Sequence, residues 1–254
     1  MTHLARDALL LAERNLRRIP RNPDLLVAFT FQPVMFVVLF SYVFGGAIST
    51  PGFEYIDFFL PGIAVQMIAF GGYATALGIS DDLRKGLIDR FRSLPMARAA
   101  VLTGRTISDG ALNCLALLVM TVAGVLIGFD FKTDLAHVVA GYGLILLFGY
   151  AMSWVYAFIG LISSTPEAAS ALITIIIFPL TFVSSAYVPT DSMPPVLEAI
   201  ANVNPITTVV DAMRSLWAGT PAGSDIAGAL AWCAGLIAVF SVLATARYRQ
   251  AVVR

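Results

Sequence analysis

The chain has 254 residues, of which 58% are hydrophobic and 13% are charged, and its formal net charge is zero. Soluble domains carry about 25% charged residues, so this composition excludes an ordinary water-soluble enzyme and indicates an all-α polytopic membrane protein. The long apolar runs are continuous and do not alternate with polar residues, which is typical of transmembrane helices and not of barrel strands.

The first 23 residues mix leucines with five arginines, a composition typical of an amphipathic helix in the cytoplasmic membrane interface. A solvated basic tail is the alternative. Six apolar runs follow, each with about the 20 residues that a helix needs to cross the hydrocarbon core. We therefore predict one transmembrane domain, residues 1–254, with six spans at residues 25–48, 58–80, 106–129, 138–164, 168–189 and 226–246.

The basic residues predict the orientation. Of 16 Lys and Arg, 14 fall before the first span, between the second and third spans, or after the last. Six spans place all three clusters on one side, which the positive-inside rule makes the cytoplasm. We expect a bacterial-type plasma (inner) membrane protein with both termini inside and with Lys132 and Arg214 outside. Cys114 and Cys233 both fall within predicted spans and do not indicate a disulfide.

Residues 81–98 form the longest charged run of the chain. Apolar residues at helical spacing lie opposite charged ones, which predicts a cytoplasmic amphipathic helix that Ser80 caps and Pro95 ends. The apolar positions are Leu83, Leu87, Ile88, Phe91 and Leu94. Spacing alone leaves open whether this helix rests on anionic lipid or docks on a partner protein.

Between the fifth and sixth spans, residues 190–225 are rich in proline yet too apolar for an ordinary loop. Apolar positions within 196–200 and 206–217 predict two short re-entrant helices that lie on the outer leaflet or dip into it. Irregular backbone at that depth is stable only where protein or water covers it.

The sequence contains no motif that indicates catalysis or nucleotide binding. Lys85 and Lys132 are the only lysines and neither follows a glycine, so a phosphate-binding P-loop is excluded. We expect no catalytic residue, no metal and no cofactor in this chain. Apart from Asp109 near the start of the third span, the spans lack charge, which argues against ion-driven transport.

The side chains available in the spans are aromatic, thioether and mildly polar, and they suit an amphipathic or lipid-like cargo. Ordinary helix packing is the alternative for each of them. The predicted pathway residues are Gln32, Met35, Phe36, Gln66, Met67, Phe70, Tyr73, Phe178, Thr181, Phe182 and Ser185. Aromatic residues form no dense track in the spans, which disfavours a polysaccharide cargo.

Three segments in this order resemble the membrane subunit of type-2 ABC transporter permeases, in particular the daunorubicin-resistance-like drug and lipid exporters. They are the basic N-terminal helix, D-D-L-R-K-G-L-I-D-R-F-R-S-L-P-M-A-R from residue 81, and N-P-I-T-T-V-V-D-A-M-R-S-L-W-A-G from residue 204. The resemblance covers essentially the whole chain. Asp81 and Asp82 stand where many members have glutamate, which favours the drug-resistance branch over the polysaccharide branch.

The resemblance implies a permease that exports an antibiotic-like drug or a lipid, driven by a separate ATPase subunit that binds ATP and Mg. It implies two ATPase copies and a second permease chain, identical or sister. Residues 81–98 would then contain the coupling helix that docks on the ATPase, with these residues in the contact: Asp82, Arg84, Gly86, Leu87, Ile88, Asp89, Arg90, Phe91, Leu94 and Pro95. An outer motif would comprise Asn204, Pro205, Arg214 and Gly219. The alternatives are a polysaccharide or glycolipid export permease and, in another class, a lipid-modifying membrane enzyme or a scaffold.

Overall fold

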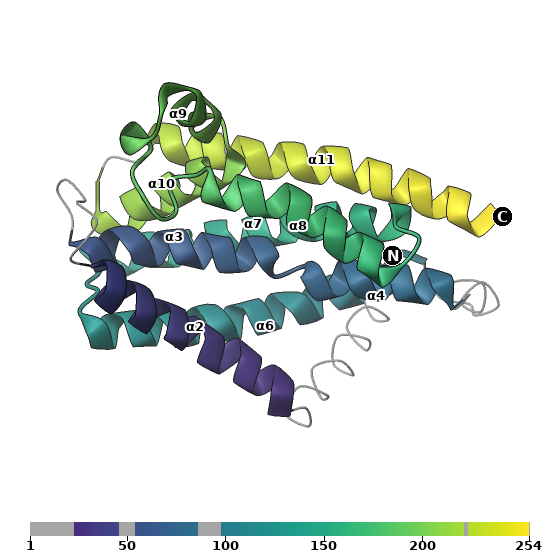
Figure 1. The fold of residues 1–254 in the computed structure, drawn as a ribbon, viewed down its shortest axis with the longest axis horizontal. Coiled ribbons are helices and arrows are strands. Elements are labelled where there is room, and N and C mark those ends of the chain that lie inside the picture. The colour runs from purple at the N-terminus through teal and green to yellow at the C-terminus, as the bar shows by residue number, and fades with distance from the viewer. Residues whose placement is uncertain (1–22, 46–53, 86–97, 221–222, 254) are drawn as a thin grey trace.

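The computed structural model describes residues 23–45, 54–85, 98–220 and 223–253, and every regular element within them is helical (Figure 1). The predicted interfacial helix at residues 1–23 therefore lies almost wholly outside the described residues. The same holds for residues 86–97, which make up most of the predicted coupling segment.

The long helices run side by side along the longest axis of the molecule, and two short helices gather at one end of it (Figure 1). We call this the α9–α10 end. In chain order the elements are α2 (Pro23–Phe44), α3 (Tyr55–Phe70), α4 (Tyr73–Arg84), α6 (Arg98–Ile127), α7 (Leu135–Ile162), α8 (Pro166–Phe182), the 3-10 turn η2 (Thr190–Ser192), α9 (Pro195–Asn202), α10 (Pro205–Ala218) and α11 (Gly223–Val253).

Three helical stretches are long and apolar enough to cross a membrane: Tyr55–Arg84, Leu135–Ile162 and Gly223–Tyr248. Thr30–Val43, Leu112–Ile127 and Pro166–Phe182 are shorter apolar helices. The chain is thus an all-helical membrane protein in the part that the structure describes. Its core gathers around α7, which packs against α11, α4, α10 and α3.

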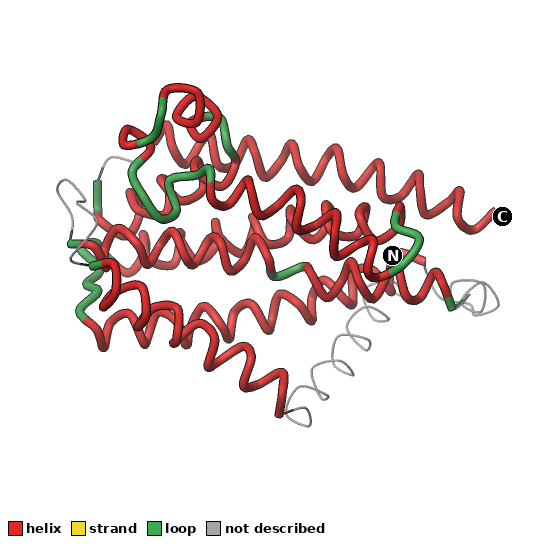
Figure 2. The backbone as a smooth tube through the Cα atoms, viewed as in Figure 1, coloured by secondary structure: helices red, strands yellow, loops and turns green. Residues whose placement is uncertain are grey.

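The second predicted span is not one straight helix. It starts at Tyr55, breaks at Gly71–Gly72 and resumes as α4, and the break shows as a short loop segment in the middle of the bundle (Figure 2). A Cβ on Gly72 would lie 2.3 Å from the Tyr156 ring, and one on Gly71 would lie 2.5 Å from the Asn113 amide. The two glycines therefore let α6 and α7 approach the backbone closely.

The predicted start of the coupling helix is wrong. Ser80 does not cap a new helix, because α4 continues to Arg84 and Lys85 caps its C-terminus. Ser80 is fully buried and its hydroxyl donates to the Ser163 carbonyl oxygen at 3.4 Å. Apolar contacts on the buried face of α4 stabilise the helix, so it continues into the charged residues that begin at Asp81.

The fifth predicted span also differs from the structure, because α8 ends at Phe182 and not at residue 189. The Asn204 amide donates to the carbonyl oxygens of Leu180 and Val183, both at 2.6 Å. The Asn204 side chain thus replaces the backbone N–H donors that another helical turn would supply to these carbonyl oxygens. The helix α8 can therefore end here.

The two short helices predicted between the fifth and sixth spans are present as α9 and α10. They differ in burial, since Ala201 is the one buried residue of α9 whereas nine of the 14 residues of α10 are buried. The helix α10 packs against α3, α7 and α11, so it enters the bundle and does not lie on its surface.

Candidate functional site

A cavity of about 280 Å³ opens beside the break between α3 and α4. Its lining comes from α2, α3, α4 and α6, with the break itself in the wall. Figure 1 shows α2 diverging from the other helices toward residue 23, and α2 contacts α3 and α6 but has few contacts with α4. The lining residues are Gln32, Pro33, Phe36, Ile63, Gln66, Met67, Phe70, Gly71, Tyr73, Ala74, Asn113 and Met120.

The lining is mostly apolar and aromatic, but three side-chain amides also line it: Gln32, Gln66 and Asn113. Asn113 is only 8% exposed, and its amide lies across the Gly71 backbone. Neither Asn113 nor Gln32 has a hydrogen-bond partner among the described residues. The cavity therefore offers free amide groups within an apolar surface.

Two tyrosines hold the wall at the break. The Tyr156 phenol donates to the Ala69 carbonyl oxygen at 2.5 Å, just before the break. The Tyr73 phenol, which lines the cavity, shares a 2.5 Å hydrogen bond with the Ser170 hydroxyl of α8. The first bond ties α3 to α7 and the second ties α4 to α8, so each side of the break has its own support.

A chain of aromatic rings leads from the cavity toward the surface of α8. Phe36 in the cavity lining stacks on Phe40 at 5.8 Å between ring centroids, Phe40 lies 5.6 Å from Tyr187, and Tyr187 lies 5.3 Å from Phe182. Phe178 continues the chain at 4.6 Å and is half-exposed. These spacings are those of favourable ring pairs.

This ring chain corrects one interpretation of the sequence. The rings come from α2, from α8 and from the turn after α8, and they are far apart in the sequence. We predicted that the spans contain no dense aromatic track. The track forms only when the helices pack, so that argument against a polysaccharide cargo no longer holds.

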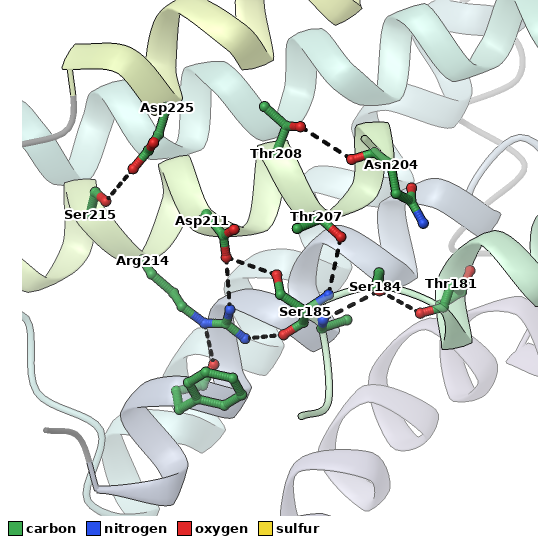
Figure 3. A network of polar contacts seen from close by, with 12 residues as sticks. Thr181, Ser184, Ser185, Asn204, Thr207, Thr208, Asp211, Arg214, Ser215 and Asp225 are labelled. Carbon is green, nitrogen blue, oxygen red and sulfur yellow. Dashed lines mark hydrogen bonds and ion pairs between the residues drawn. The ribbon is translucent and has the colours of Figure 1, made fainter. Parts of the chain in front are cut away.

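At the α9–α10 end, a buried arginine joins three segments of the chain (Figure 3). The Arg214 guanidinium donates to the Phe58 carbonyl oxygen at 2.9 Å, to the Ser185 carbonyl oxygen at 2.5 Å and to the Asp211 carboxylate at 3.0 Å. Its carbon Cζ also lies 3.5 Å from the centroid of the Phe58 ring. The arginine is 8% exposed, so its expected accessibility from outside is wrong. The hydrogen bonds and the ring compensate for its lost hydration.

The other predicted outer-motif residues have local roles in the same region. Asn204 caps α10 by accepting from the Ile206 amide at 2.8 Å, and Pro205 occupies the first turn, where a missing N–H costs nothing. Gly219 ends α10 at φ 69°, and a Cβ there would lie 2.6 Å from the Lys132 carbonyl oxygen. The motif thus builds the α9–α10 end; no residue of it lines the cavity.

The structure divides the eleven predicted pathway residues. Six line the cavity: Gln32, Phe36, Gln66, Met67, Phe70 and Tyr73. Phe178 and Phe182 belong to the ring chain, while Met35 is 42% exposed and does not line the cavity. Thr181 and Ser185 lie in the polar region near Arg214, where Thr181 donates to Ile177 within α8.

Of the predicted coupling residues, only Asp82 and Arg84 are described, and both lie in the last turn of α4. The remaining eight, Gly86, Leu87, Ile88, Asp89, Arg90, Phe91, Leu94 and Pro95, lie outside the described residues. Arg84 is exposed and is the last residue of α4. Figure 1 shows α4 on the side of the bundle opposite to α9 and α10.

Sequence reasoning missed Asn113, Tyr156 and Ser170. Asn113 carried a usable signal, because it is the only side-chain amide between residues 106 and 129. Tyr156 and Ser170 carried none, since each matters through a partner on another helix. Within the described residues, no three His, Cys, Asp or Glu side chains come together as metal ligands would.

Comparison with known proteins identifies the family. The family described as ABC-2 type transporter matches residues 6–217. The daunorubicin resistance ABC transporter permease protein DrrB1 of Streptomyces coeruleorubidus is 34% identical over 228 residues, which cover 90% of this chain and 81% of that protein. The doxorubicin resistance ABC transporter permease protein DrrB of Mycobacterium tuberculosis (strain ATCC 25618 / H37Rv) is 25% identical over 150 residues, 56% of this chain and 52% of that protein. This chain therefore belongs to the ABC-2 type transporter family, as a membrane permease that works with an ABC ATPase subunit.

Proposed function

We propose that this permease exports a hydrophobic or amphipathic compound, an antibiotic-like drug or a lipid, from the cytoplasm or the inner leaflet. Two copies of a separate ATPase subunit bind the ATP and Mg that drive the export, and this chain holds no cofactor. The observation that carries the cargo assignment is the cavity of about 280 Å³ with its apolar and aromatic lining. Its volume is just below the roughly 300–1,000 Å³ of small-molecule sites. The names of the drug-resistance relatives support the same cargo class.

The path from ATPase to cargo runs along α4 in this proposal. The helix lines the cavity through Tyr73 and Ala74 at one end and reaches Arg84 at the other, next to the coupling segment. A helix of 12 residues transmits a push along its axis without bending, and the glycines at the break let it move relative to α3. Docking of the coupling residues would thereby change the cavity.

The proposal includes six spans with both termini in the cytoplasm of a bacterial-type inner membrane, in one domain of residues 1–254. Three of the six proposed spans are the broken helix α3–α4, α7 and α11. The other three are the shorter apolar stretches of α2, α6 and α8. The α9–α10 end then faces outward and Arg84 faces the cytoplasm, which agrees with the distribution of basic residues.

A second permease chain, identical or sister, completes the transporter in this proposal. Phe31 on α2 and Phe178 and Phe182 on α8 are each at least half-exposed in the single chain. The ring chain from the cavity ends at the same α8 face. A partner chain on this face would continue the path beyond one subunit.

A polysaccharide or glycolipid is the second candidate cargo, and the ring chain favours it. Sugar rings stack on aromatic side chains, and the rings of Phe36, Phe40, Tyr187, Phe182 and Phe178 follow one another at stacking distances. The cavity's small volume favours the drug or lipid, so we retain that assignment.

Affinity purification of the tagged chain in mild detergent tests the assembly. We expect a stoichiometric partner with a P-loop and ATPase activity in the eluate. The double variant Ile88→Ala, Phe91→Ala should insert normally but lose the partner. The matched control Val196→Ala, Ile200→Ala removes two exposed apolar side chains from α9 and should retain it. A chain that elutes alone in several detergents would instead support the lipid-modifying enzyme or the scaffold.

A further inference from the structure

We propose that Tyr187 is a gate that closes the cavity toward the α9–α10 end, and that α10 holds this gate shut through Ser185. This deepens the proposed function and rests on it for the transport path that the gate closes. Tyr187 is the ring at which the chain of aromatic rings from the cavity meets α2, α3 and the end of α8.

Three rings form a layer beside the cavity: Phe40 of α2, Phe59 of α3 and Tyr187 after α8. Their centroids lie 4.9 Å apart for Phe40 and Phe59, 5.6 Å for Phe40 and Tyr187, and 6.1 Å for Phe59 and Tyr187. Phe40 follows the cavity residue Phe36 by about one helical turn, and Phe59 precedes the cavity residue Ile63 by about one turn. The end of α2 and the start of α3 lie at the same end of the molecule as α9 and α10 (Figure 1). The ring layer therefore borders the cavity on the side of the α9–α10 end.

Tyr187 differs from the other two rings of the layer in its backbone. Phe40 and Phe59 belong to regular helices, whereas Tyr187 lies in the connection between α8 and η2, which has no regular helix. Phe59 is fully buried and Tyr187 is only partly buried. Moving a ring on such a connection changes a few backbone angles and breaks no helix. Tyr187 is therefore the ring of the layer that can move away from the cavity.

The connection is held by Ser185, because each of its three polar groups is bound by a different side chain of α10 (Figure 3). Its N–H donates to the Thr207 hydroxyl at 3.2 Å, its hydroxyl donates to the Asp211 carboxylate at 2.8 Å, and its carbonyl oxygen accepts from Arg214 at 2.5 Å. The three α10 residues follow one another at intervals of four and three residues, so they lie on one face of the helix. One helix face thus fixes the backbone two positions before Tyr187.

The other side of the same connection is closed by α3. Ala186 is fully buried, and a Cβ on Gly62 would lie 2.0 Å from the Ala186 carbonyl oxygen. The backbone before Tyr187 is therefore wedged between α3 and α10. Non-helical backbone inside a membrane protein needs such partners for its polar groups. The gate can open only when α10 releases Ser185 or moves with it.

The experiment measures whether a water-borne reagent reaches the cavity from each side of the membrane. The reporter is Met67→Cys, at a cavity residue, in a chain that also carries Cys114→Ala and Cys233→Ala. The charged, membrane-impermeant thiol reagent MTSET is added to intact cells or to inside-out vesicles, and the labelling rate is measured for each. A separate chain with Val196→Cys, at an exposed position on α9, identifies the side on which the α9–α10 end lies.

The first test variant is Tyr187→Ala, which removes the gate's contacts with three other rings. We expect it to raise the labelling rate of the reporter from the α9–α10 side at least about tenfold. Tyr187→Phe keeps the ring and should stay within about twofold of the reporter chain. Phe178→Ala removes a half-exposed ring at the far end of the ring chain and should also leave the rate unchanged.

The second test variant is Ser185→Ala, which keeps the ring and removes only the hydroxyl that donates to Asp211. We expect a rise of about threefold to tenfold in the labelling rate from the same side. The matched control is Ser192→Ala, the same change at an exposed serine whose hydroxyl donates to the Pro189 carbonyl oxygen. Should Tyr187→Ala not fold, this pair carries the test.

A gate has an effect on one side only, whereas a loosened fold admits the reagent from both sides. An equal rise from both sides, an unchanged rate in Tyr187→Ala, or fast labelling of the reporter chain from the α9–α10 side would overturn the inference. A rate in Ser185→Ala that matches Ser192→Ala would overturn the part assigned to α10.

The labelling needs neither an ATPase nor a cargo, so the two proposals fail separately. A one-sided rise in Tyr187→Ala, without ATP-driven export by the assembled complex, would overturn the exporter assignment and leave the gate standing. ATP-driven export together with an unchanged labelling rate in Tyr187→Ala would overturn the gate alone.

Discussion

The two halves of the broken helix differ in how they are held. Twelve of the 16 residues of α3 are buried, and Arg214 binds its Phe58 carbonyl from α10. Only four of the 12 residues of α4 are buried, and it ends at exposed Arg84 and Lys85. The cavity lies where the two halves meet.

This difference separates a fixed half from a movable one. Low burial gives a segment a low free energy of local unfolding or displacement, whereas a buried arginine with several hydrogen bonds resists both. A transporter needs one part to hold the cargo site in shape and another to receive force. We therefore expect changes near α3 to affect stability first and changes near α4 to affect transport first.

The strongest test of the fixed half is Arg214→Leu. It removes three hydrogen bonds and the Phe58 ring contact and leaves buried carbonyl groups without donors. Each buried polar group left without a partner costs about 1–3 kcal/mol, so we expect a large fall in the thermal unfolding midpoint in detergent. Arg84→Leu, at the exposed end of α4, is the matched control and should leave the midpoint nearly unchanged. Similar midpoints for the two variants would contradict the comparison.

Glycine substitutions test both halves with the same chemical change. A Cβ on Gly62 would lie 2.0 Å from the Ala186 carbonyl oxygen, which is backbone, and one on Gly72 would meet the Tyr156 ring at 2.3 Å. Overpacking costs about 1–3 kcal/mol, and a side chain can yield more than backbone. We expect Gly62→Ala to lose more stability and Gly72→Ala to lose more ATP-driven export per folded molecule.

Gly143→Ala is the control for that pair, because a Cβ at this helical position meets open space. It should raise helix stability by about 0.5–1 kcal/mol and leave export unchanged. Export of Gly72→Ala that matches Gly143→Ala would show that the break has no role in coupling.

The sequence predicted the broad fold because length and hydrophobicity alone decide where apolar helices form. Each of the six predicted spans overlaps a helix, and α9 and α10 lie where proline and apolar spacing put them. The break at Gly71–Gly72 could not be predicted, since glycine pairs are also common inside transmembrane helices. Its cause is the approach of Tyr156 and Asn113, which lie far along the chain.

The cavity was predicted in part and the α9–α10 end less well. Six lining residues on α2, α3 and α4 were found from the type of their side chains, which are aromatic, thioether or mildly polar. Arg214 was expected at the surface because charge normally seeks water. Its partner Phe58 lies 156 positions earlier, a distance at which no local pattern carries information.

A smaller effect is expected for Tyr73→Phe, which removes the hydroxyl that Tyr73 shares with Ser170. One neutral hydrogen bond contributes about 0.5–1.5 kcal/mol, so global stability should change little. Because this bond is a support of the movable half, amide hydrogen exchange should increase in α4 and not in α3. Tyr156→Phe, which frees the Ala69 carbonyl, should instead increase exchange in α3. Equal changes in both helices for either variant would argue that α3 and α4 move as one body.

The smallest effect is expected for the exposed ion pair between Lys132 and Asp57, whose charged atoms lie 2.6 Å apart at the fixed end. The hydrogen bond and the charge of Asp57 raise the pKa of Lys132. The stabilisation is therefore complete below the ordinary lysine pKa and is lost only as pH rises through the raised value. Lys132→Met should lower the unfolding midpoint slightly, and by the same amount at about pH 6 and about pH 9. The difference in midpoint between this variant and the wild type should be smaller in 1 M salt, where the screening length is about 3 Å. Lys85→Met, which breaks a 2.6 Å pair with Asp81 within one helix turn, is the control in the movable half. A midpoint loss for Lys132→Met as large as that for Arg214→Leu would mean that exposed charge, and not the buried arginine, holds the fixed half together.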